Sequence, residues 1–158
     1  MISKINSWKW LALFSLIILA AGCDNSLARH EEDFSDGCWA IADTLDLMYE
    51  NTDPNLKVMV TAPITFTGEY AFNNLYLRMV AIAPSGQVSV LPYEYELMDV
   101  QGDWYGDISG DNASFVLPLS VNQVFPETGT YRFRIYHFMQ TELLCGVSKA
   151  GITVMPGE

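Results

Sequence analysis

Basic residues are scarce in this sequence of 158 residues, with eight lysines and arginines against nineteen aspartates and glutamates and a formal net charge of −11. Two of the eight, Lys4 and Lys9, lie in an N-terminal segment that we expect to be removed, so the remainder carries −13, from six basic and nineteen acidic residues. Nucleic acid is therefore excluded as a partner class, because it requires a basic surface. An anionic membrane would also repel this chain, so a membrane-bound form needs another means of attachment.

Motifs that carry catalysis are missing as well. The sequence has no nucleophile elbow, no phosphate-binding glycine loop and no HExxH zinc motif. Its two histidines, His30 and His137, lie neither beside a patterned carboxylate or serine nor at a spacing from cysteine that suits zinc. We expect His137 to be a packed residue, since it shares a strand face with Phe133. The sequence thus predicts a protein that is not an enzyme and has no cofactor.

The apolar run Trp10–Ala21 is too short for a transmembrane helix, which needs roughly 20 apolar residues. It follows the positive charges of Lys4 and Lys9 and ends in small residues directly before Cys23. This layout is typical of a cleaved signal peptide, which we place at residues 1–22. An uncleaved membrane span is the alternative.

The residues Leu19–Cys23 resemble a lipobox, although Ala20 stands where leucine is usual three places before the cysteine. We therefore expect Cys23 to carry lipid; the alternative is an ordinary cysteine after a general signal peptide. Two or three acyl chains provide the multiple signals that stable anchoring needs. Residues 23–37 are polar and acidic, so we predict a lipidated, flexible tether there and a folded domain over 38–158.

Two cysteines remain, Cys38 and Cys145, one near each end of the folded part. An exported chain meets an oxidising compartment, where such a pair can form a disulfide. The alternative is two buried free thiols that pack as small apolar residues.

Alternating apolar and polar residues recur along the domain, whereas helical periodicity does not. In the clearest strand, Tyr131, Phe133 and Ile135 share one face while Arg132 and Arg134 take the other. The predicted strands are Thr44–Tyr49, Leu56–Phe66, Asn74–Ala83, Gln87–Met98, Ala113–Ser120, Gly129–Met139 and Gly146–Met155. This pattern predicts an all-β fold, an antiparallel two-sheet β-sandwich of immunoglobulin-like or jelly-roll-like type.

Local features refine this interpretation. A turn delivers Tyr131 at the start of a strand, as in the tyrosine corner of β-sandwiches. Tyr93 and Tyr95 alternate with glutamates and are expected in the core. A short helix over Phe138–Leu144 is a further, less supported possibility.

The most polar loop places four aspartates among glycines and turn residues. They are Asp99, Asp103, Asp107 and Asp111. Their oxygen atoms suit calcium, but the spacing fits no EF-hand loop, so solvated turns are the main interpretation and a calcium site the weaker one. Within the same loop, Trp104 and Tyr105 are candidates for a binding patch that stacks on a sugar or a protein.

Three stretches, Phe72–Leu77, Tyr95–Gly106 and Val124–Tyr131, resemble the gliding motility lipoprotein GldH family in order and spacing. The resemblance covers most of the chain from about Trp39 to Val154, and includes the leader. It implies a lipid-anchored envelope protein of Bacteroidota tied to the gliding machinery and its linked secretion system, with no enzymatic activity known for the fold. The family supplies no catalytic residues, and Cys38 and Cys145 are not part of its pattern.

Two functions follow from these observations. The first is a non-catalytic accessory subunit in the cell envelope, expected at the outer membrane, whose partners are other envelope proteins of the gliding and secretion machinery and which offers a sheet face or edge strand to them. The second is a surface glycan-binding lipoprotein, which rests on Trp104 and Tyr105. Exposure of Trp104 distinguishes the two, because burial would remove the main support for glycan binding.

Overall fold

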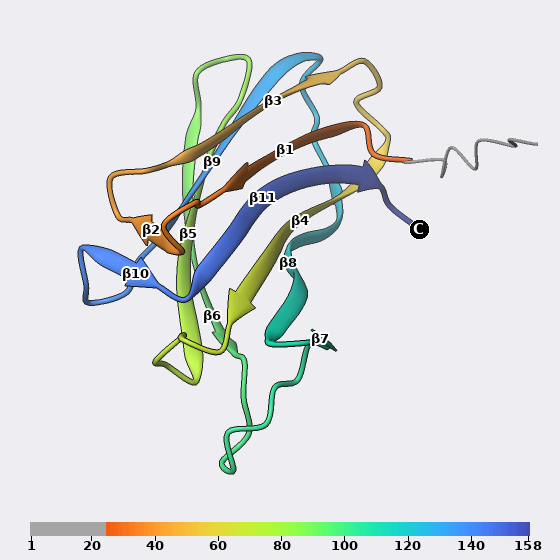
Figure 1. Cartoon of the computed structure of the whole chain (residues 1–158). Coiled ribbons are helices and arrows are strands. Elements are labelled where there is room, and N and C mark those ends of the chain that lie inside the picture. Colours follow the sequence, from red (N-terminus) through yellow and green to blue (C-terminus); the bar gives the residue numbers. More distant parts are fainter. Residues whose placement is uncertain (1–24) are drawn as a thin grey trace, which may run out of the picture.

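The computed structural model describes residues 25–158 of the chain, and this part is built of strands and connecting loops (Figure 1). No helix that could cross a membrane is found among these residues. The strands are β1 (Ala28–Asp33), β2 (Cys38–Ala40), β3 (Leu45–Asn51), β4 (Lys57–Thr67), β5 (Asn74–Ile82), β6 (Val88–Glu96), β7 (Asp107–Ser109), β8 (Asn112–Val124), β9 (Gly129–His137), β10 (Leu143–Cys145) and β11 (Val147–Pro156).

The strands form two main antiparallel sheets and a small third one. One sheet has the order β1-β11-β4-β8-β7, the other β3-β9-β5-β6, and β10 pairs with β2. The orders β1-β11-β4-β8 and β3-β9-β5-β6 are those of a jelly roll, in which two four-stranded sheets face each other. The predicted all-β sandwich is therefore confirmed, and of its two expected types the jelly-roll order is the one observed.

The core lies between the inner faces of the two sheets. On β9, Tyr131, Phe133, Ile135 and His137 are buried, while the residues between them are more exposed, as strand alternation requires. β4 and β11 supply the facing layer, with long runs of buried residues along both strands. Tyr131 accepts a hydrogen bond at its hydroxyl from the Glu127 backbone N–H, 3.1 Å away, which confirms the predicted tyrosine corner.

The seven predicted strands all appear, with ends shifted by a few residues. The possible helix over Phe138–Leu144 is wrong, because the chain turns there and enters the short strand β10. Its backbone groups instead pair with β2 and with neighbouring loops, as in Ile41 N–H to Glu142 O at 2.8 Å.

The expected flexible tether over residues 23–37 is also wrong where it overlaps β1. Ala28–Asp33 pairs along its length with β11, from Ala28 opposite Val154 to Asp33 opposite Lys149. Few apolar side chains are needed for this, because β1 is an edge strand held by backbone hydrogen bonds, with one face solvated. Ion pairs add to it, since Lys149 Nζ lies 3.3 Å from the Asp33 carboxylate. The sandwich thus begins about ten residues earlier in the chain than the expected boundary at residue 38.

Candidate functional site

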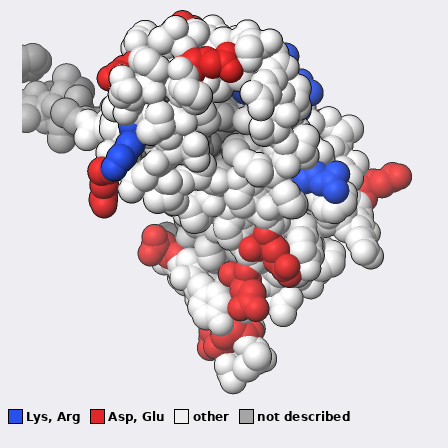
Figure 2. Space-filling model, turned by 180° about the vertical axis from the view of Figure 1, so that it is seen from behind, with Lys and Arg blue, Asp and Glu red and all other residues white. Residues whose placement is uncertain are grey.

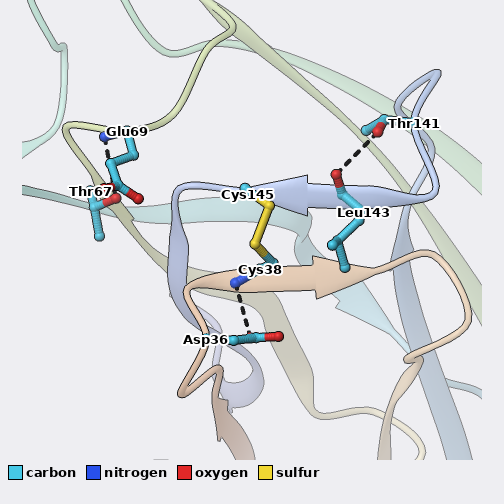
Figure 3. Close-up of a disulfide and its surroundings, with 7 residues drawn as sticks. All are labelled: Asp36, Cys38, Thr67, Glu69, Thr141, Leu143 and Cys145. Carbon is cyan, nitrogen blue, oxygen red and sulfur yellow. Dashed lines mark hydrogen bonds between the residues drawn. A yellow bond between two sulfur atoms is a disulfide. The ribbon is translucent and has the colours of Figure 1, made fainter.

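Cys38 and Cys145 form a disulfide across the small sheet (Figure 3). They stand directly opposite each other in the β2–β10 register and join positions 107 residues apart in sequence. The Cys38 backbone N–H also donates to the Asp36 carboxylate at 3.2 Å, which holds the turn before β2. The bridge therefore joins β2 to β10 at one end of the sandwich.

The structure separates the two members of the predicted aromatic patch. Trp104 packs inward, with its ring centroid 5.6 Å from that of Phe66 and 6.0 Å from that of Phe115. Tyr105 is 62% exposed. Because the half-buried indole packs against these rings while Tyr105 is exposed, Trp104 and Tyr105 do not make a shared platform for a sugar ring.

The aspartate-rich loop is organised by its own backbone. The Asp99 carboxylate accepts hydrogen bonds from the N–H groups of Gln101, at 2.8 Å, and Asp103, at 2.9 Å, which is an Asx-turn arrangement. Asp107 and Asp111 lie at either end of the β7 hairpin. In residues 25–158 no group of three or more histidine, cysteine or acidic residues could hold a metal ion, so the calcium alternative has no support there.

Acidic side chains gather at this end of the molecule, where the β6–β7 loop projects (Figures 1 and 2). The middle of the face seen in Figure 2 carries few charged groups. Charge is therefore concentrated at the tip and the rim of this face.

His137 is fully buried, as expected for a packed histidine. Its ring meets that of Trp39 edge to face at a centroid distance of 5.5 Å. Burial in these apolar surroundings lowers the pKa of His137 below its ordinary value, because the charged imidazolium loses its hydration.

We expect the free energy of unfolding to fall as the pH drops from 8 to 5. The unfolded chain binds a proton at His137 below about pH 6.5, whereas the folded chain resists this proton until a lower pH, so acid favours unfolding. Urea unfolding at both pH values measures the effect. His137→Leu should flatten this dependence. Equal slopes in the wild type and His137→Leu would contradict the assignment.

One seam between the two sheets is closed by tyrosines from β6. The Tyr95 hydroxyl donates to the Pro118 carbonyl of β8 at 2.6 Å, and the Tyr93 hydroxyl donates to the Leu119 carbonyl. The two rings stack on each other at 6.1 Å. Both tyrosines pack against the core, as predicted, and burial raises the pKa of each, so they stay protonated donors at neutral pH.

Beyond these tyrosines the same seam opens into a groove of about 400 Å³. We call it the β6–β8 groove. Its wall on one sheet is formed by Met79, Ala81, Ser89 and Leu91, and its wall on the other includes Ser120. The Ser120 hydroxyl is buried and has no hydrogen-bond partner among the residues that the structure describes. Such an unsatisfied buried group is costly in folding free energy.

A second hollow, of about 620 Å³, lies at the end of the sandwich beside β2 and β10. It is lined by Ile41, Phe72, Asn74, Tyr76, Phe138, Met139 and Gln140. The Arg78 guanidinium lies 3.6 Å from the centroid of the Phe138 ring, a cation–π contact that holds one wall. This hollow is shallow and largely apolar, and its aromatic side chains are partly exposed.

Sequence reasoning missed both hollows, because each combines residues from strands and loops far apart in the chain. One local signal did exist for the groove. Val88–Tyr93 contains no charged residue, whereas a solvated strand in so acidic a chain would be expected to carry several. The predicted signal peptide 1–22 and the predicted lipid site Cys23 lie outside the described residues.

Comparison with known sequences gives two results. The family model described as "GldH lipoprotein" matches residues 26–154. The gliding motility lipoprotein GldH homolog of Christiangramia forsetii is 27% identical to this chain over 124 residues, which cover 78% of this chain and 76% of that protein.

Comparison with solved structures gives more distant likenesses. A carbohydrate-binding module specific for non-crystalline cellulose shares 7% identity at a TM-score of 0.48, over 82% of this chain and 73% of that one. Dimeric latent PorU from Porphyromonas gingivalis shares 10% identity at a TM-score of 0.37, over 84% of this chain and 13% of that one.

Proposed function

This chain belongs to the GldH lipoprotein family, and from that premise we propose that it is a lipid-anchored, non-catalytic accessory component of the gliding motility machinery and its linked secretion system. We place the lipid on Cys23 and the protein at the outer membrane. Other envelope proteins of that machinery are the proposed partners. The membership of a lipoprotein family, together with the lipobox-like run before Cys23, is the observation that carries this proposal.

The distance between the proposed anchor and the fold supports a role close to the membrane. Only four residues lie between Cys23 and Ala28, the first residue of β1, so five residue-to-residue steps join the two. Even fully extended, they span about 18 Å, since each residue adds at most about 3.6 Å. A lipid on Cys23 would therefore hold the sandwich near the membrane by the end at which β1 begins, with the disulfide-bonded strands β2 and β10 near the opposite end of β1.

Glycan binding is the weaker alternative in this structure. The two aromatic residues that motivated it are separated, because Trp104 is half-buried against Phe66 and Phe115 and Tyr105 is exposed. A single exposed tyrosine beside carboxylates offers little stacking area for a sugar.

We expect alkyne-tagged palmitate to label this protein in cells and Cys23→Ser to lose the label, because the cysteine thiol is the acylated group. The unlabelled variant should also leave the membrane fraction, since the mature charge of −13 gives no electrostatic attraction to anionic lipid. Metabolic labelling followed by fractionation measures both changes.

The matched control is Cys38→Ser, which removes a thiol of the disulfide and should keep the label. Labelling that persists in Cys23→Ser would refute the anchor. Protease added to intact cells then separates the two functions: protection supports a subunit inside the envelope, and digestion favours a surface protein.

A further inference from the structure

The first half of β6 is an open sheet edge. In the described part of the chain β6 pairs only with β5, and it is the last strand of its sheet. Gln87 O accepts from Ala83 N–H at 2.9 Å, and Leu97 N–H donates to Asn73 O at 2.8 Å, both in the register of the β5–β6 ladder. Because an antiparallel ladder alternates, the odd-numbered residues face β5, and the backbone groups of Val88 and Val90 point outward.

Pro92 fits this assignment. It falls on an outward-facing position, where its missing N–H breaks no hydrogen bond to β5. It also interrupts the row of free donors, so the usable edge is the stretch before it, Val88–Leu91.

The first half of β6 differs from the other sheet edges in residues 25–158. Beyond Ser114, β8 also has no outer strand partner, but there the Pro118 and Leu119 carbonyls accept hydrogen bonds from Tyr95 and Tyr93. β1 carries Arg29, Glu31, Glu32 and Asp33, and charged side chains discourage the addition of another strand. β7 has only three residues, and β3 lies beside β1. In contrast, Val88 is 57% exposed and Val90 53% exposed, with no charge between them.

The β6–β8 groove lies directly under this edge. Ser89 and Leu91 project from β6 into it, and Ser120 stands on the far wall with its unpartnered hydroxyl. A strand added to β6 would bond to the outward groups of Val88 and Val90 and place alternate side chains in the groove. Edge and groove together therefore form a single site for an extended segment.

Both ends of this site are acidic. Glu127 lines the groove at one end, where its carboxylate accepts hydrogen bonds from Ser85, and Glu94 lies on β6 just beyond Pro92 at the other, where its carboxylate accepts from the Tyr76 hydroxyl. An apolar segment with a basic residue at each end complements this arrangement.

A second copy of this chain fits less well. In a β6-to-β6 dimer each strand keeps its inward side chains over its own groove, so neither groove is filled. Two copies, each with a mature charge of −13, also repel each other.

We propose that Val88–Leu91 and the β6–β8 groove bind an extended segment of another envelope protein, with an alternating apolar centre and basic ends, added as a further strand of the sheet. This inference rests on the proposed accessory function and names the surface that serves it. The side chains that enter the groove give specificity, and the backbone of β6 gives the common part of the affinity.

The test uses the full chain, purified in detergent with its disulfide intact, and the fluorescent peptide Lys-Val-Thr-Val-Thr-Val-Lys. The fluorescence anisotropy of the peptide should show saturable binding, and hydrogen exchange should slow at the backbone N–H groups of Val88 and Val90.

Val90→Pro removes an outward N–H without disturbing the β5 ladder, and it should weaken peptide binding at least about tenfold. Val90→Thr keeps the N–H and is the matched control. Ser89→Trp fills the groove and should weaken binding while it leaves the edge intact.

A peptide with glutamate in place of lysine should bind more weakly than the basic one. No saturable binding, or equal binding by wild type and Val90→Pro at unchanged thermal stability, overturns the proposal. Protection of β1 in place of β6 also overturns it. If the wild type sediments as a dimer and Val90→Pro as a monomer, the β6 edge serves self-association instead, which also overturns the proposal. Palmitate labelling is independent of all these readouts, so failure of the anchor and failure of this site are distinguishable.

Discussion

Replacing Cys38 by serine is expected to lower the free energy of unfolding by about 4 kcal/mol, the largest single loss that we predict. The bridge to Cys145 spans 107 residues, and on the chain-entropy model a loop of that length restricts the unfolded chain by about 4–5 kcal/mol. It also holds two three-residue strands together, and strands this short are marginal on their own. Urea unfolding under non-reducing conditions measures the change.

Cys145→Ser and the double variant should match Cys38→Ser, because each removes the same link. Cys23→Ser supplies the matched control and should leave the unfolding of the domain unchanged, since Cys23 precedes β1. Reduction of the wild type should reproduce the loss. If the variants and the wild type unfold at the same urea concentration, the disulfide does not contribute to stability.

Gly146→Ala is expected to cost about 3 kcal/mol or more, the sum of a left-handed backbone at about 1–2 kcal/mol and overpacking at about 1–3 kcal/mol. Gly146 has φ +82°, and a Cβ built there would lie 2.3 Å from the Tyr70 backbone N and 2.4 Å from its Cα. Tyr70 cannot easily move aside, because its hydroxyl bonds to Asn74 O at 2.8 Å and its ring packs on Phe66. Thermal and urea unfolding both report the loss.

Gly110→Ala separates the two contributions. Gly110 also has a positive φ, +61°, but a Cβ there would meet nothing within 4 Å. It should cost only the backbone share, about 1–2 kcal/mol. If Gly146→Ala and Gly110→Ala lower the free energy of unfolding equally, the Tyr70 backbone does not exclude a Cβ at position 146, which would contradict the packing described above.

Local alternation accounts for the strands that were found from sequence. On β9 and β4 the buried and exposed residues follow the period of two closely enough that the seven long strands, the all-β class and the buried His137 can be predicted without the tertiary structure. The turn before Tyr131 is likewise a local signal, and its hydrogen bond to Glu127 is present. The resemblance to the GldH lipoprotein family rests on short stretches of sequence, and the family is confirmed over residues 26–154.

Elements that depend on a distant partner could not be found in this way. β1 is polar and acidic and resembles a linker, yet β11, more than 100 residues later, supplies its hydrogen bonds. β10 was mistaken for part of a helix because its three residues pair only with β2. Trp104 could not be placed, since its neighbours Phe66 and Phe115 come from other strands.

The sequence by itself determined the charge of the protein, the apolar run before Cys23, its strand-rich class and its family, because each is written in composition or in contiguous residues. Only the tertiary structure decided which sheet edge stays open and which aromatic side chains are buried. The open edge and the groove lie on the N-terminal side of Tyr93, the residue whose hydroxyl bonds β6 to β8 of the opposite sheet. Hydrophobic alternation specifies which face of a strand is inward, but strand order specifies its neighbours, and that order is a property of the whole chain.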